Sequence, residues 1–148
     1  MLQQILPELF DRDLAKLKTE ISTYSNPDDI WKTAEGISNS GGNLCLHLVG
    51  NLKHFVGKTL GNIAYERQRD KEFSDKQVPV SELIRSIDET RQAVISTLKM
   101  LSDEDIARVY PIHVFGTPMT TGSFLMHLYG HLNYHLGQVN YHRRLLNK

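Results

Sequence analysis

The sequence predicts an all-α protein: a four-helix bundle with a short extra helical turn or an ordered loop between helices. Two observations lead to this fold class. Four long segments repeat apolar residues at intervals of three and four, the spacing that places them on one face of a helix. Strand-like alternation is almost absent, and its one candidate, residues 110–115, is better interpreted as an ordered loop. Amphipathic helices without strands bury their apolar faces against one another and so form a bundle.

Length and composition indicate one globular domain that spans residues 1–148. A chain of 148 residues is long enough to bury a substantial hydrophobic core. Its hydrophobic content of 40% and charged content of 23% are ordinary for a soluble protein. The 17 basic residues balance the 17 acidic ones, so no net charge attracts nucleic acid or an acidic membrane. We therefore expect neither nucleic acid nor a membrane as a partner.

Cysteine usage and the first residues indicate a cytoplasmic protein. Cys45 is the only cysteine, which excludes an internal disulfide and a cysteine-based zinc site and suits a reducing compartment. The first residues lack the basic start and the long apolar run of a signal peptide. No stretch approaches the roughly 18 consecutive apolar residues that cross a bilayer as a helix.

The first predicted helix covers residues 2–24. Pro7 falls early enough to be tolerated near its first turn. The helix is expected to end at the turn-forming residues 25–27, after which residues 28–31 form a short helical turn. A loop of small polar residues then covers positions 35–43. The apolar stripe of this helix consists of Leu6, Phe10, Leu14, Leu17 and Ile21.

The second predicted helix covers residues 42–63, with Ser40 as its N-cap. Gly50, Gly57 and Gly61 lie inside it, and each weakens a helix by roughly 1 kcal/mol relative to alanine. We expect a neighbouring helix or a ligand to approach these glycines closely and so to compensate for the cost. The apolar stripe consists of Leu44, Leu48, Leu52, Phe55, Val56 and Leu60.

A long polar connection, residues 64–79, separates the second helix from the third. Its length permits a crossover rather than a tight hairpin. The third helix is expected over residues 81–101 with Ser81 as its N-cap, and its charged outer face is interpreted as a solvated surface. Residues 102–105 can cap one more helical turn, and residues 109–117 look extended.

The last predicted helix, residues 121–146, holds four of the seven histidines: His127, His131, His135 and His142. The first three are four residues apart, and two imidazoles at that spacing can bind one metal ion. His127 and His135 are separated by about 12 Å along the axis at a rise of ~1.5 Å per residue. One ion can therefore take either of the two adjacent pairs, which share His131. The alternative is that these histidines are hydrogen-bonded residues at the edge of the core, and the spacing leaves both interpretations open.

A third ligand is available on the second helix, where His47 lies beside the apolar stripe. Helical bundles build metal sites from side chains on facing helices. Three imidazoles suit Zn²⁺, Ni²⁺ or Fe²⁺ and suit Mg²⁺ or Ca²⁺ poorly. The spacing does not establish that His47 faces His131; both simply lie on inward-turned edges of their helices.

Three stretches resemble the DinB-like family of metalloenzymes, which includes the YfiT-type proteins and bacterial thiol-dependent transferases. They are His47–Leu52, Arg67–Phe73 and His131–Gln138, and the resemblance covers nearly the whole chain. In that family one histidine of the second helix and two of the last helix bind a divalent metal. The resemblance therefore implies His47, His131 and His135 as the metal ligands and leaves His127 as a spare neighbour.

The resemblance also implies a function. Better-understood members of the family use a low-molecular-weight thiol, which they conjugate to an electrophile or employ as a cofactor in an isomerisation. We therefore expect a metal-dependent transferase or hydrolase that acts on a small molecule through an activated thiol or water. The alternative is a non-catalytic, metal-binding, dimeric stress-response or small-molecule-binding protein. The resemblance further implies a homodimer, although the sequence shows no clear seam.

Several other residues have competing interpretations. Gln138 shares a face with His131 and His135, where it either supports a ligand or packs between helices. Arg67 and Arg69 are interpreted as solvated loop residues. Four further residues are assigned no chemistry: Cys45 as a small core residue, and His142 with Arg143 and Arg144 as cations at a helix C-terminus.

Overall fold

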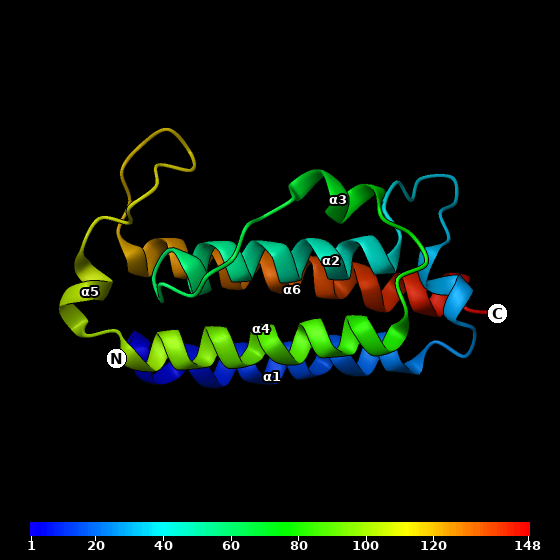
Figure 1. Cartoon of the computed structure of the whole chain (residues 1–148), viewed down its shortest axis with the longest axis horizontal. Coiled ribbons are helices and arrows are strands. Elements are labelled where there is room, and N and C mark those ends of the chain that lie inside the picture. The colour runs from blue at the N-terminus through cyan, green and yellow to red at the C-terminus, as the bar shows by residue number, and fades with distance from the viewer.

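Four long helices make up the structure, a computed structural model that describes all residues 1–148. Helices α1 (Leu2–Thr23) and α4 (Val80–Met100) lie side by side in one layer, and α2 (Gly41–Leu52) and α6 (Thr121–Leu146) lie in the other (Figure 1). Each layer packs on the other through α1 against α6 and α2 against α4. The predicted all-α bundle is thereby confirmed, and none of its helices combines the length and apolar content needed to cross a membrane.

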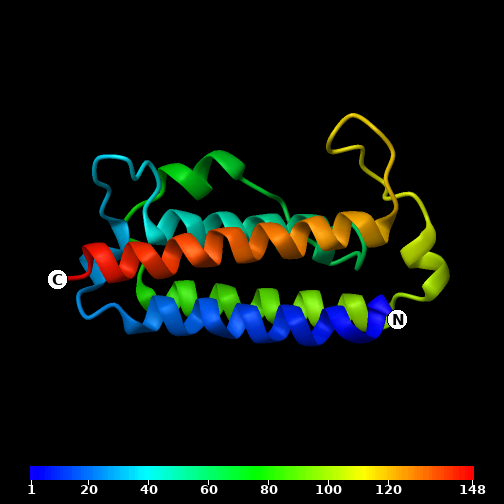
Figure 2. The same ribbon diagram turned by 180° about the vertical axis from the view of Figure 1, so that it is seen from behind.

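The connection between α2 and α4 is a crossover, as its length permitted. Helices α2 and α4 run in the same direction, and α1 and α6 run in the opposite one (Figures 1 and 2). The connection carries a short helix that the sequence did not predict, α3 (Arg69–Ser74), which lies over α2. A six-residue helix is not stable by propensity alone. It is anchored here by the side-chain amide of Asn43, which donates hydrogen bonds to the backbone carbonyls of Glu72 and Asp75 at 2.9 Å each.

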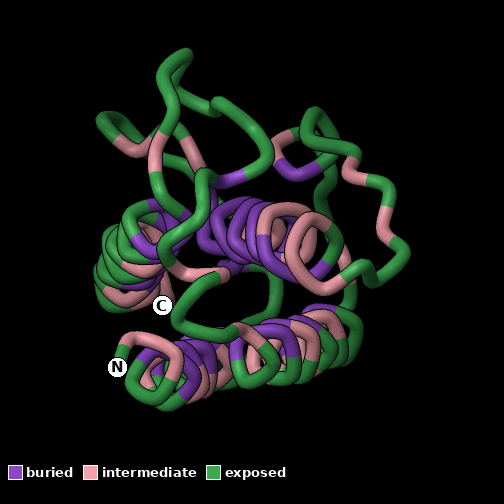
Figure 3. The backbone as a smooth tube through the Cα atoms, turned by 90° about the vertical axis from the view of Figure 1, so that its left-hand side faces the viewer, coloured by how far each residue is buried: buried purple, intermediate pink, exposed green.

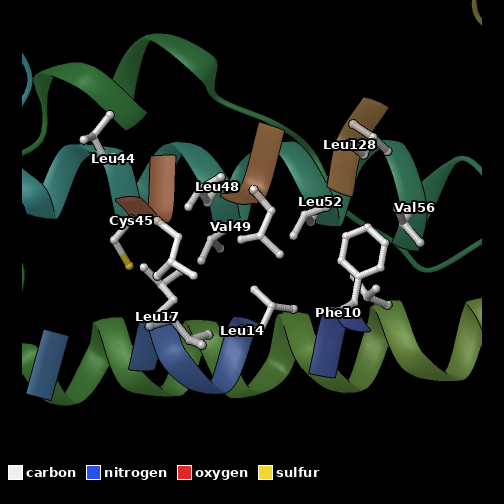
Figure 4. Packing of buried hydrophobic residues seen from close by; sticks show 14 of the residues in the cluster. Phe10, Leu14, Leu17, Leu44, Cys45, Leu48, Val49, Leu52, Val56 and Leu128 are labelled. Carbon is white, nitrogen blue, oxygen red and sulfur yellow. The ribbon is translucent and has the colours of Figure 1, made fainter. Parts of the chain in front are cut away.

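The hydrophobic core lies between the two layers. Buried positions of the long helices face inward, and exposed positions form the outer surface (Figure 3). The predicted stripe of α1 is fully buried, and Figure 4 shows Phe10, Leu14 and Leu17 facing residues of α2. Cys45 is buried in this core, and burial raises the pKa of its thiol to about 12, so the predicted role of a small core residue is confirmed.

Two of the three predicted helix caps are confirmed. The Ser40 hydroxyl accepts a hydrogen bond from the backbone N–H of Asn43 at 3.1 Å and so caps the N-terminus of α2. Ser102 caps the short helix α5 (Asp103–Ala107) in a capping box with Asp105. Ser81 is not a cap, because α4 already begins at Val80: the carbonyl of Pro79 accepts from the amides of residues 82 and 83 and so closes the first turn.

The second helix changes its geometry after Leu52. Residues Lys53–Lys58 form a π-helical segment, η2, so the regular helix predicted over residues 42–63 is shorter than expected. A Cβ atom at Gly50 would overlap the Glu72 carboxylate, and one at Gly61 would overlap the Thr97 side chain. The expected close approach is therefore found at these two glycines. Gly57 has only ordinary van der Waals neighbours.

The short helical turn predicted after α1 is a 3₁₀ helix, η1 (Pro27–Trp31), and the chain beyond it is fixed by His142. This residue is not a solvated cation at a helix end, because it is buried between Tyr24 and the backbone of Lys32. The Lys32 carbonyl can only accept, so Nε2–H of His142 donates to it at 2.8 Å. Nδ1 then accepts a hydrogen bond from the Tyr24 hydroxyl at 2.6 Å.

Replacing Tyr24 with phenylalanine should destabilise the fold. Tyr24→Phe leaves the buried Nδ1 atom of His142 without a donor, which costs about 1–3 kcal/mol. Urea unfolding monitored by circular dichroism measures this loss. Tyr65→Phe is the matched control, because the half-buried Tyr65 hydroxyl makes no hydrogen bond in the structure. Equal stability of the two variants would contradict the role of the Tyr24–His142 pair.

Candidate metal centre

Three histidines from two helices meet on the side of the α2–α6 layer nearest α3. The Nε2 atoms of His47 in α2 and His131 in α6 are 3.1 Å apart. One ring nitrogen from each of these residues and from His135 lies within 4.8 Å of the other two. The structure therefore brings together the three residues that the sequence analysis selected. Their role as metal ligands stays a prediction.

The antiparallel packing of α2 and α6 decides which histidines meet. His47 projects between two successive turns of α6, with its ring centroid 5.0 Å from that of His131 and 5.2 Å from that of His135. His127 precedes His131 by one turn of α6 and remains exposed. Its ring stacks on His131 at 6.3 Å and contacts Phe115 at 4.8 Å between centroids. Of the two pairs that the spacing allowed, the structure therefore brings His131 and His135 to His47.

Two of the three histidines are oriented by a neighbouring side chain. Nδ1 of His47 donates to Oε1 of Glu72 at 3.0 Å, and Nδ1 of His135 donates to Oε1 of Gln138 at 2.7 Å. Each bond places the ring proton on Nδ1 and leaves the lone pair of Nε2 directed at the centre. Hydrogen bonds of this kind fix the tautomer and the ring orientation of metal-binding histidines. Of the two interpretations of Gln138, this hydrogen bond favours support of His135 over packing between helices.

Glu72 is the residue of this site that sequence reasoning did not identify. Its carboxylate is buried and accepts hydrogen bonds from Nε and Nη2 of Arg67, both at 2.9 Å. Burial alone would raise the pKa of Glu72, but the bonds from His47 and Arg67 outweigh it and hold the pKa below its ordinary value. Glu72 lies in a polar connection without periodicity. Its presence in one of the three stretches that resemble known metalloenzymes was the only available signal.

Arg67 is therefore not a solvated loop residue, as the sequence analysis expected. Its side chain is only 12% exposed because it pairs with the buried carboxylate of Glu72. Arg69 does remain at the surface, where its guanidinium lies 5.4 Å from the centre of the Phe73 ring. The difference arises because α3 turns Glu72 toward His47, and Arg67 follows the carboxylate inward.

The chemistry of the three imidazoles fits a divalent transition metal. Burial first, and then the neighbouring histidines, lower the pKa of His131 to about 4, and burial lowers the pKa of His135. These rings are thus neutral at pH 7, the form that binds metals. The Nδ1 atom of His131 is buried and has no hydrogen-bond partner. Two ligands of a tetrahedral zinc ion lie about 3.3 Å apart, for Zn–N bonds of roughly 2.0–2.1 Å, so the observed separations require only small side-chain movements.

Fold and site together define a helical bundle with a three-histidine cluster that can hold a metal ion between two antiparallel helices. The chain matches DUF1572, a family described as proteins of unknown function, over residues 8–148, and it belongs to this family. A comparison with curated proteins gives no match.

A solved structure supports the fold. The crystal structure of a DinB-like protein from Bacillus cereus ATCC 10987 resembles this chain with a TM-score of 0.67 and 21% sequence identity. The alignment covers 89% of this chain and 84% of that protein. The DinB-like fold expected from the sequence is therefore confirmed. At 21% identity the similarity supports a shared fold and does not extend to function.

The lowered pKa of His131 predicts how the stability of the metal-free protein depends on pH. Between pH 6.5 and about 4 the unfolded chain binds a proton on this residue and the folded protein does not. The free energy of unfolding should therefore fall as the pH falls through this window. His131→Gln should flatten the dependence, and His127→Gln, at an exposed position on the same helix, should not. Urea titrations in the presence of a chelator measure it, and parallel pH profiles for wild type and His131→Gln would contradict the assignment.

Proposed function

We propose that the protein is a divalent-metal-dependent enzyme that acts on a small molecule, with His47, His131 and His135 as ligands. The observation that carries this proposal is the convergence of three ring nitrogens, two of them preset by Glu72 and Gln138. Three protein ligands leave one position of a tetrahedral ion open, which is the arrangement of catalytic zinc sites. An all-imidazole set favours Zn²⁺, Ni²⁺ or Fe²⁺.

The reaction that suits the site is transfer of a low-molecular-weight thiol to an electrophile, as the resemblance to DinB-like metalloenzymes implies. A divalent cation bound here would lower the pKa of a coordinated thiol or water and so supply a nucleophile at neutral pH. The chain itself offers no such thiol, because Cys45 is buried and protonated in the core. The nucleophile must therefore come with a substrate. Water in its place would make the protein a hydrolase.

Aromatic side chains on the outer side of the histidines support an electrophile with an apolar or aromatic body. The ring of Phe73 lies 4.9 Å from His47, and the ring of Tyr134 lies 5.2 Å from His135. Phe115 reaches the same side through its contact with His127. Aromatic rings prefer such stacked and edge-on partners.

A cavity lies beside Gln138, although none of the three histidines lines it. Gln138, which orients His135, also lines a cavity of about 240 Å³ beside residues 36–39. A substrate in this cavity would lie next to the residue that positions a ligand.

The second candidate is a non-catalytic role, in which a metal stabilises the bundle of a stress-response or binding protein. The observation that favours it is that the three ligands and Glu72 connect α2, α3 and α6. A metal bound at this junction would hold these three elements together whether or not a reaction took place.

Metal analysis tests the ligand assignment. The purified protein, reconstituted with Zn²⁺ or Ni²⁺, should bind about one equivalent, because three neutral imidazoles and one open position make a single site. His131→Ala should abolish binding, and His127→Ala should retain it, since His127 lies outside the cluster. Elemental analysis and calorimetric titration measure both. Less than about half an equivalent after reconstitution would contradict the site, and loss of binding in His127→Ala alone would reject the chosen pair.

Thiol consumption separates the enzyme from the binding protein. The metal-loaded protein, mixed with a low-molecular-weight thiol and chlorodinitrobenzene, should form a carbon–sulfur bond and release chloride and a proton. The rate should exceed that of the chelator-treated protein by at least about tenfold, since activation of the nucleophile depends on the metal. His131→Ala should show only the background rate. No consumption across several thiols, with metal bound, would leave hydrolysis or the non-catalytic role.

A further inference from the structure

The guanidinium of Arg67 uses only one of its edges within the chain. Nε and Nη2 donate along this edge to the two oxygens of the Glu72 carboxylate, both at 2.9 Å. Nη1 makes no hydrogen bond and is open to solvent, although the side chain as a whole is only 12% exposed. Nη1 and the second N–H of Nη2 make up what we call the free edge. Two parallel N–H groups of this kind match the two oxygens of a carboxylate.

The free edge lies beside the three histidines. Nη2 of Arg67 and Nδ1 of His47 donate to the same atom, Oε1 of Glu72, so the guanidinium and this imidazole are neighbours. The guanidinium also lies 5.6 Å from the centre of the Phe55 ring, which holds it on a second side. Burial is the main cause of the lowered pKa of His131, and the charge of Arg67 contributes to it. A group bound at Arg67 would therefore be close to a small molecule at the metal centre.

Polar atoms without a partner gather on the same part of α2, η2 and α6. Five buried side-chain atoms of the structure make no hydrogen bond, and three of them are Oδ1 of Asn51, Nδ1 of His54 and Nδ1 of His131. Asn51 follows His47 by one turn of α2, and His54 follows it by about two turns. Buried polar atoms are otherwise nearly always hydrogen-bonded to protein or to ordered water. This concentration therefore indicates a place where a polar molecule binds.

The balance of charge favours an anionic ligand. Arg67 and Glu72 cancel each other, and metal-binding histidines are neutral, so the charge of a bound divalent cation would be uncompensated. Burial lowers the pKa of His54 most, and the charges of Arg67 and Lys58 lower it further. Glu72 is the only carboxylate that acts on this ring. A negative group would thus meet several cations where water is partly excluded, and attraction between charges is strong there.

We propose that the free edge of Arg67 binds the carboxylate of the small molecule that the metal centre activates. The substrate class is then a small carboxylic acid whose thiol, or other nucleophilic atom, lies a few bonds from the acid group. The proposal rests on the proposed metal centre for the position of the nucleophilic atom, whereas the carboxylate contact depends on Arg67. In this arrangement Glu72 orients His47 and also holds the guanidinium so that its second edge remains available.

Binding to the metal-free protein tests the carboxylate contact by itself. With a chelator present, benzoate at millimolar concentrations should shift the Nε–H signal of Arg67 in a nitrogen-15 NMR spectrum, because its carboxylate pairs with the guanidinium. The signal is assigned by its absence from the spectrum of Arg67→Lys. Benzamide has the same shape without the charge and should leave the signal in place. No shift with benzoate, or an equal shift with benzamide, would overturn the proposal.

Thiol binding to the cobalt-loaded protein tests whether the carboxylate and the metal are reached by one molecule. Cobalt(II) suits the same imidazole ligands, and a bound thiolate gives it a near-ultraviolet absorption band, so binding is measured without a reaction. The wild type should bind 3-mercaptopropionate at least about tenfold more tightly than 3-mercaptopropanol, its neutral analogue of equal length, because only the acid forms paired, charge-assisted hydrogen bonds. The preference for the acid should fall at least about fivefold in Arg67→Lys, since an ammonium has no second edge.

Two controls separate recognition of the carboxylate from support of the site. Arg67→Lys should bind the neutral thiol as the wild type does, because lysine keeps a cation beside Glu72. Arg69→Lys makes the same change at an exposed neighbouring position and should keep the full preference for the acid. Equal binding of both thiols to the wild type, or equal loss of both in Arg67→Lys, would overturn the proposal. A wild type that takes up no cobalt would contradict the metal centre instead, and the benzoate titration would still decide on Arg67.

Discussion

The buried carboxylate of Glu72 is the group on which the arrangement of the site depends. A charge out of contact with water is tolerated only when it is paired and hydrogen-bonded, and here Arg67 and His47 meet that requirement. Room for the carboxylate exists because residue 50 is glycine. The short helix that carries Glu72 is in turn held over α2 by Asn43. The crossover connection, the glycine in α2 and the orientation of His47 therefore all depend on the position of the Glu72 carboxylate.

Burial gives the histidines their chemical character. A histidine in water near neutral pH is divided between its charged and neutral forms. At the junction of α2 and α6, burial lowers the pKa of His131 and of His135, so the neutral form that binds metals dominates. Without a cation, His131 can hold its proton on Nε2 and donate it to Nε2 of His47 at 3.1 Å, because its Nδ1 atom has no partner. A cation bound at these Nε2 atoms would therefore displace that proton from the Nε2 atom of His131.

The sequence predicted what depends on local periodicity and missed what depends on contacts between distant segments. The bounds of α6 were predicted because its core stripe and turn signals are local, and so was the stripe of α1. The histidine spacing alone left two pairs open, since only the packing of α2 against α6 brings His47 to one of them. The positions of Arg67 and His142 were wrong for a related reason. His142 is drawn inward by the backbone carbonyl of Lys32, which is remote in the sequence. Arg67 follows the carboxylate of Glu72, which is only five residues away but is buried because α3 packs on α2.

Helix α6 explains the unusual composition of the last third of the chain. One of its faces packs in the core, and a second presents His131 and His135 to α2. The third face carries the large exposed side chains of Met126, Tyr134, Tyr141 and Leu145. No charged residue occurs between residues 109 and 142, so this face lacks the charges that usually keep a solvated surface soluble. Because Tyr134 and His135 are adjacent in sequence and their rings are in contact, this exposed face borders the candidate metal centre.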